Sequence, residues 1–112
     1  MYRVQFFKTA RGENYVKDFI DGLQAAVREK IIVQISYLGD CGNLARRPYA
    51  ALLRDKVYEL IISFAHLEVR ILYFFDEKVI ILTHGFLKKT QAVPTVEIDR
   101  AIAIRAAWFR GK

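Results

Sequence analysis

"KVYELIISFAHLEVRILYFFDEKVIILTHGF", residues 56–86, decides the fold of this chain, because Val, Ile, Leu, Phe and Tyr dominate it. These side chains favour β-strands. The interruptions "SFAH" and "FDEK" divide the stretch into three strands, at about 56–64, 66–75 and 78–86. Each connection is too short for a crossover helix, so neighbouring strands are predicted to be antiparallel.

The second and third of these strands have different patterns. Leu67, Val69, Ile71 and Tyr73 share one face of the second strand. The other face carries His66, Glu68 and Arg70, which predicts one apolar face and one polar face. The third strand is apolar on both faces, so we expect it to lie in the interior of the sheet.

The sequence on either side of the strands predicts a short opening strand and three helices. Residues 2–7 are β-prone, and residues 13–23 and 27–38 have the apolar spacing of amphipathic helices. A glycine in "LGDCGN" (38–43) is expected to end the second helix in a left-handed conformation. Thr95, after Pro94, is a plausible N-cap for a last helix.

The order of these elements is β-α-α-β-β-β-α. It predicts an α+β fold with a small antiparallel sheet and the helices packed on one face. We expect a single domain over residues 1–112, because a chain of this length leaves no room for a second core.

Charge and cysteine content indicate where the protein acts. The net charge of +6 favours an anionic partner, such as nucleic acid or an acidic protein. The single cysteine, Cys41, cannot form an intramolecular disulfide, which is typical of a reducing compartment. The N-terminal stretch has no signal-peptide pattern and no apolar run approaches the ~20 residues that span a bilayer. A soluble, cytoplasmic protein without membrane contact is therefore expected.

Several kinds of chemistry have no support in the sequence. Two histidines and one cysteine show no metal-ligand spacing. No glycine-rich phosphate loop occurs, and neither serine in the apolar segments lies in a nucleophile turn. We therefore expect neither a metal site nor a cofactor.

Cationic side chains near the ends of the central strands remain as candidates. Arginine offers a planar fork to a phosphate and lysine a compact charge, and both stabilise charge that develops on phosphorus when a 2′-hydroxyl attacks it. His84 or the carboxylate of Glu59 could move the protons. Together they would suffice for metal-free RNA cleavage. The cationic candidates are Arg54, Lys56, Arg70, Lys88 and Lys89.

Each candidate also has a structural interpretation. Arg70 could be a solvated strand residue in an ion pair, and the two lysines an ordinary charged turn. His84 could be a hydrogen-bonded structural histidine, and Glu59 a counterion. Arg46 and Arg47 before Pro48 form a basic loop that could touch a nucleic acid backbone.

"KVYELIISF" (56–64) and "VRILYFFDEKVIILTHGFLKKTQAVPTVEIDRA" (69–101), with the order of elements, resemble the RelE/ParE superfamily of bacterial toxins. The likeness is greatest to its HigB-like, phage-derived branch. The resemblance implies the toxin of a type II toxin–antitoxin pair. Such a toxin would cut mRNA on the ribosome by 2′-hydroxyl attack, leave a cyclic phosphate and need no metal. A protein antitoxin, often of the helix-turn-helix type, would neutralise it.

The resemblance also implies roles for matching positions. Arg70 corresponds to the strand arginine expected to contact the scissile phosphate. Lys88 and Lys89 match a lysine pair that would bind phosphate or ribosomal RNA. His84 matches the histidine of the "HGF" turn, and Glu59 the glutamate of "YEL".

Phe86, in the same turn, could stack a base. Ile61 departs from the family pattern, which usually has an arginine after "YEL". Two alternatives to RNA cleavage therefore stay open. One is a non-enzymatic inhibitor like the gyrase-poisoning branch of the superfamily, and the other is a relative that only binds its antitoxin.

Overall fold

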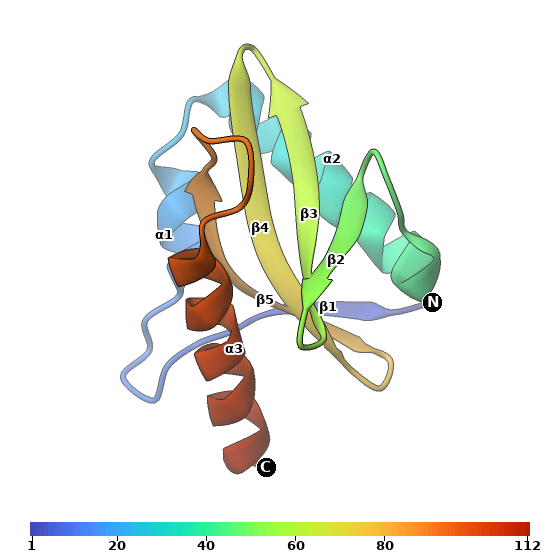
Figure 1. The fold of residues 1–112 in the computed structure, drawn as a ribbon, viewed down its shortest axis with the longest axis vertical. Coiled ribbons are helices and arrows are strands. Elements are labelled where there is room, and N and C mark those ends of the chain that lie inside the picture. The colour runs from blue at the N-terminus through green and yellow to red at the C-terminus, as the bar shows by residue number, and fades with distance from the viewer.

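The computed structural model describes all residues, 1–112, and has an α+β architecture with five strands and three α-helices (Figure 1). The predicted fold class and the three central strands are confirmed. A short 3₁₀ helix, Gly42–Leu44, follows the second α-helix. The elements in chain order are β1 (Arg3–Phe6), α1 (Tyr15–Asp21), α2 (Ala25–Cys41), β2 (Ala50–Arg54), β3 (Val57–Phe64), β4 (Leu67–Asp76), β5 (Val79–Leu87) and α3 (Thr95–Arg110).

The strands form one sheet in the order β1-β5-β4-β3-β2. Strands β2 to β5 are antiparallel neighbours, as predicted for β3, β4 and β5, and β5 lies in the interior. The expectation of a wholly antiparallel sheet is wrong at one edge, because β1 runs parallel to β5 with Val4 opposite Ile80. The sheet is therefore mixed. Strand β2 was not predicted, because it has only five residues and its Leu52 is 59% exposed.

Helices α1 and α2 cover one face of the sheet. Val16 of α1 and Ile31 and Leu38 of α2 join the main core, together with Leu60 of β3 and Ile71 of β4. All five side chains are completely buried. Burial of this apolar area is the main force that holds the helix pair on the sheet.

Helix α3 crosses the opposite face, so the prediction that all helices pack on one face is wrong. Ala101 contacts the cluster of Val57 and Leu72, and Ile104 joins Phe74 and Ile81. The physical reason is that the sheet is apolar on both faces near the start of β5, and an uncovered apolar face would stay in contact with water. The remaining part of this second face is polar.

The helix ends agree with the sequence in one case and differ in another. Gly42 ends α2 with φ of +56°, as predicted for a glycine stop, and the Tyr2 ring lies where a Cβ would project. At α3, Pro94 occupies the N-cap and Thr95 is already helical, without a side-chain cap hydrogen bond. The N-cap prediction for Thr95 is wrong. No helix combines the length and the apolar character that crossing a membrane would require.

Candidate functional site

A hollow of about 250 Å³ opens on the second face of the sheet, beside α3. Strands β2, β3 and β4, the residue after β5 and the loop into α3 all contribute to it. We call it the basic hollow. Its lining residues are Arg47, Leu53, Glu59, Arg70, Lys88, Gln91, Ala92 and Val93.

Strand register brings the charged residues of the basic hollow together. Arg70 lies opposite Ile61 of β3 and Phe86 of β5, two positions from the pair of Glu59 and Leu72. Glu59 and Arg70 therefore project from the same face of neighbouring strands. The Lys88 N–H donates to the carbonyl of Glu68 at 2.7 Å, which continues the β4–β5 pairing and fixes the lysine beside the hollow.

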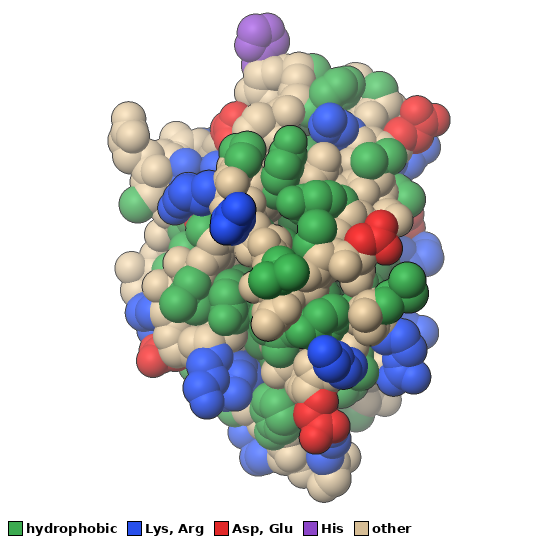
Figure 2. Space-filling view, turned by 90° about the vertical axis from the view of Figure 1, so that its right-hand side faces the viewer, with side chains coloured by type: hydrophobic (Ala, Val, Ile, Leu, Met, Phe, Trp, Pro, Cys, Tyr) green, Lys and Arg blue, Asp and Glu red, His purple; other side chains and the backbone are tan.

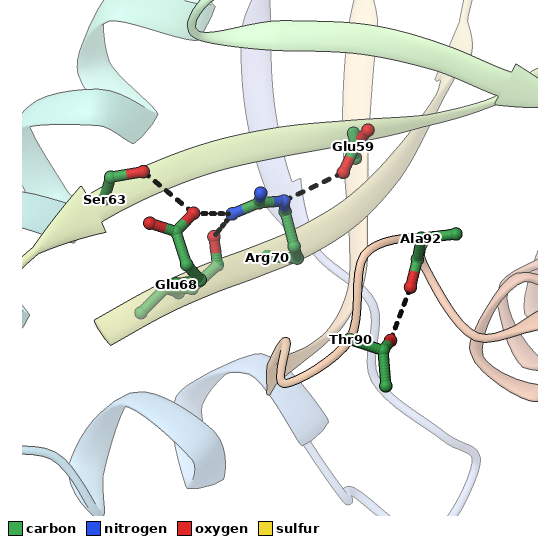
Figure 3. Close-up of polar contacts among 7 residues, drawn as sticks. Glu59, Ser63, Glu68, Arg70, Thr90 and Ala92 are labelled. Carbon is green, nitrogen blue, oxygen red and sulfur yellow. Dashed lines mark hydrogen bonds and ion pairs between the residues drawn. The ribbon is translucent and has the colours of Figure 1, made fainter. Parts of the chain in front are cut away.

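Arg70 is held from two sides. Its Nε donates to Glu59 Oε1 at 2.9 Å, and its Nη1 donates to Glu68 Oε1 at 3.1 Å and to the Val69 carbonyl at 3.0 Å (Figure 3). Nη2 has no hydrogen-bond partner within the protein. Because the side chain is only 8% exposed, these contacts fix the guanidinium and leave Nη2 for a ligand.

Glu68 is a part of this arrangement that the sequence interpretation did not select. Ser63 Oγ donates to Glu68 Oε1 at 2.9 Å. That hydrogen bond, followed by the bond from Arg70, lowers the pKa of the Glu68 carboxyl. The Glu68 carboxylate therefore stays charged, and its hydrogen bond helps to hold the Arg70 guanidinium in position. The sequence feature that could have identified Glu68 is its position two residues before Arg70, which places both side chains on one face of the strand.

The charges around the basic hollow favour an anion. Arg47, Arg70 and Lys88 line it, against the single lining carboxylate of Glu59. Figure 2 shows the side that carries β2 and α2, where Lys and Arg side chains are spread widely and acidic ones occur singly. The net charge of +6 gives the whole molecule the same bias.

His84 does not line the basic hollow. It is 1% exposed, and its Nδ1 and Nε2 lie 3.0 Å from Thr83 Oγ1 and Glu97 Oε1 respectively. Burial lowers the pKa of the imidazole, against the opposing effect of the Glu97 hydrogen bond. Its ring stacks on Phe86 at 5.8 Å. The structure therefore places His84 where it joins β5 to α3.

The other sequence candidates also lie outside the lining of the hollow. Arg54 forms ion pairs with Asp55 at 2.9 Å and Asp99 at 2.5 Å. Three other cations are exposed: Lys56 in the β2–β3 turn, Lys89 after β5 and Arg46 before β2. Phe86 packs with the cluster under α3.

The sequence interpretation missed the apolar wall of the hollow. Leu53 and the loop residues 91–93 carry no charge or motif that would have drawn attention, and only the fold places them beside Arg70. No group of three or more His, Cys, Asp or Glu side chains is arranged to hold a metal ion.

The sheet order, the helix pair on one face and the single helix on the other define the class of small RelE-type folds. The structure resembles the crystal structure of the isolated E. coli RelE toxin, P21 form, with a TM-score of 0.56 and 17% identity. The match covers 89% of this chain and 98% of that one.

The family model described as phage derived protein Gp49-like (DUF891) matches residues 18–105, and the chain belongs to this family. No curated protein matches the chain. The family and the RelE fold together support the placement in the RelE-like toxin superfamily that the sequence resemblance indicates.

Proposed function

We propose that this protein is the toxin of a type II toxin–antitoxin pair and that it cuts mRNA on the ribosome at the basic hollow. The observation that carries the proposal is the meeting of Arg47, Arg70 and Lys88 beside the lining carboxylate of Glu59, with Arg70 Nη2 free for a ligand. The family and the fold support the class of toxin.

In the proposed reaction, Glu59 takes the proton from the 2′-hydroxyl. The 2′-oxygen then forms a bond to phosphorus, and the bond from phosphorus to the 5′-oxygen breaks. The Lys88 ammonium supplies the proton to the departing 5′-oxygen. The products are a 2′,3′-cyclic phosphate and a 5′-hydroxyl, so atoms and protons balance without a metal.

Arg70 has a different role in this proposal, because it holds charge and moves no proton. Nη2 of Arg70, with Arg47, would contact the phosphate oxygens as negative charge develops on them. Its fixed position matters, because a donor that is already in place needs no rearrangement during the reaction. His84 is left out of this mechanism, since it is buried at α3.

The exposed cations near the hollow are proposed to hold the RNA. Lys89 follows Lys88 and Arg46 precedes Arg47, so both would contact the backbone of mRNA or ribosomal RNA next to the cut. Arg54, Lys56 and Phe86 would contribute at a greater distance from it. A cognate protein antitoxin, of the helix-turn-helix type as the resemblance implies, and a cytoplasmic site of action complete the proposal.

Adjacent lysines provide the test. Lys88 lines the hollow and Lys89 does not, so Lys88→Ala should slow ribosome-dependent cleavage by roughly 100-fold or more, as the loss of one transition-state donor does. Lys89→Ala should cost no more than about a few-fold, as one backbone contact does. Primer extension on mRNA from an in vitro translation reaction measures both. Equal losses of cleavage activity in the two variants, or full activity of Lys88→Ala, would refute the assignment of Lys88 to the cleavage reaction.

A second candidate is a toxin or relative that binds without cutting RNA. The favouring observation is Ile61, which lies opposite Arg70 in the sheet register where related toxins usually carry an arginine. Expression that arrests growth and induces DNA damage, without cuts in mRNA, would point to gyrase inhibition. Unimpaired growth with tight antitoxin binding would point to a relative that has lost activity.

A further inference from the structure

A groove runs between β1 and the C-terminal part of α3. This part of α3 extends beyond the sheet (Figure 1). Two hollows of about 570 and 240 Å³ form it and share Lys8 and Trp108. We call it the β1 groove. It shares no residue with the basic hollow.

The strand beside this groove has a free edge, because β1 ends the sheet and pairs only with β5. The Arg3 N–H donates to the Lys78 carbonyl at 3.0 Å, and the Phe7 N–H donates to the Leu82 carbonyl at 2.9 Å. Because alternate residues of a strand point in opposite directions, the odd-numbered residues of β1 face β5. Val4 and Phe6 therefore direct their N–H and C=O groups to the open side, and both line the groove.

The free edge of β2 is less suitable for another strand. The β2–β3 register shifts between Leu52 and Arg54, so β2 is irregular within its five residues. No register shift interrupts the pairing of β1 with β5. A regular edge with unpaired backbone groups is a template for strand addition.

The walls of the β1 groove define the side chains that it would accept. Trp108 Nε1 donates to Asp76 Oδ2 at 2.8 Å, which fixes the indole as an apolar wall. Lys112 neutralises Asp76, whereas Lys8 forms no ion pair. The unpaired charge of the groove is therefore positive, which matches an acidic partner.

We propose that an extended acidic segment of a partner protein binds in the β1 groove and adds a sixth strand to the sheet. Its backbone pairs with Val4 and Phe6, an Asp or Glu side chain meets Lys8, and an apolar side chain packs on Trp108. At roughly 3.3 Å per residue, a segment of about four to six residues matches the length of β1. A nucleic acid fits less well, because the groove offers one unpaired cation but a row of strand-spaced backbone groups. The inference does not depend on RNA cleavage.

The experiment is a selection of random 12-residue peptides on the full-length protein. Acidic peptides with alternating apolar residues should be enriched, and a synthetic copy of an enriched peptide should change the emission of Trp108, the single tryptophan. NMR hydrogen exchange should show new protection of the Val4 and Phe6 amides. The amide of Gln5, which faces β5, should be protected with and without peptide.

Two matched variants test the charge of the groove. Lys8→Glu should weaken the peptide by roughly tenfold, because it places a like charge against the acidic side chain. Lys30→Glu makes the same charge change on α2, over the other face of the sheet, and should leave the affinity unchanged. The same peptide with every amide nitrogen methylated should not bind, since it cannot form a ladder.

Four results would overturn the proposal. They are a failure to enrich any peptide, protection of amides outside β1, equal binding of the methylated peptide, and equal effects of the two charge reversals. A single-stranded oligouridylate that changes the Trp108 emission when the peptides do not would assign the groove to nucleic acid instead.

Discussion

Arg70→Ala is expected to destabilise the fold strongly, so a loss of activity in this variant would not by itself show a catalytic role. The Arg70–Glu59 pair is short, at 2.9 Å, and the two side chains are only 8% and 7% exposed. At an effective dielectric constant of about 20, this separation corresponds to about 6 kcal/mol of attraction before the cost of desolvation. Removal of one partner leaves a buried, uncompensated carboxylate at Glu59, which costs about 3–5 kcal/mol.

That loss should be visible in both chemical and thermal unfolding. Globular proteins gain about 2.1 cal/mol/K of unfolding entropy per residue, so for this chain about 3–5 kcal/mol corresponds to a fall in Tm of roughly 13–21 °C. Urea unfolding followed by Trp108 fluorescence and circular dichroism gives the free energy directly. Replacement of both partners, Arg70→Met with Glu59→Leu, should cost much less than either single loss, because no buried charge remains.

An exposed pair provides the control. Lys17 and Asp21 on α1 lie 2.7 Å apart but are 64% and 56% exposed. Lys17→Ala should therefore lower the free energy of unfolding far less than Arg70→Ala does, although its ion pair is shorter. Two results would contradict a buried, coupled pair. One is a loss of unfolding free energy in Arg70→Ala no larger than that in Lys17→Ala. The other is a loss in the double replacement at residues 59 and 70 equal to the sum of the two single losses.

Three further predictions concern other residues. Ile61→Arg should place a second guanidinium beside Arg70 and speed ribosome-dependent cleavage by about tenfold or more; an unchanged rate in primer extension would show that the missing arginine does not limit activity. The lowered pKa of His84 means that its contribution to stability is present above the unfolded-state pKa of about 6.5 and is lost as the pH falls below it. The free energy of unfolding should therefore decline from pH 6.5 to 5, and His84→Gln should flatten this decline; an identical slope in the variant would contradict it. Gly42→Ala should lower the free energy of unfolding by about 1–3 kcal/mol, because its φ of +56° strains an L-residue and the Tyr2 ring occupies the space of the new Cβ; urea unfolding with an unchanged midpoint would refute the clash.

Between pH 6.5 and 5, the change in the free energy of unfolding that we assign to His84 is separate from the effects of the carboxyl groups whose pKa values are also shifted. Hydrogen bonds from Ser63 to Glu68, and from Lys112 to Asp76, lower the pKa of each of these carboxyls. Their contributions to stability are present above the ordinary carboxyl pKa and disappear only as the pH falls below about 4.5. A decline between pH 6.5 and 5 therefore has a different source.

Local pattern determined the central elements of this protein. The apolar run from 56 to 86, broken twice, predicted β3, β4 and β5 within about one residue at each end, because strand-forming side chains and turns act over short distances. Apolar spacing likewise predicted α1 and α2. The position of Arg70 on the polar face of its strand followed from alternation alone.

Only the tertiary structure decided how these elements meet. The pairing of β1 with β5, the crossing of α3 over the second face and the burial of His84 have no local signal, since they depend on contacts between segments far apart in the chain. The same holds for Arg47, which reaches the basic hollow from the loop before β2. Periodicity fixes which side of its own strand or helix a residue occupies, whereas the partner on that side is chosen by the packing of the whole chain.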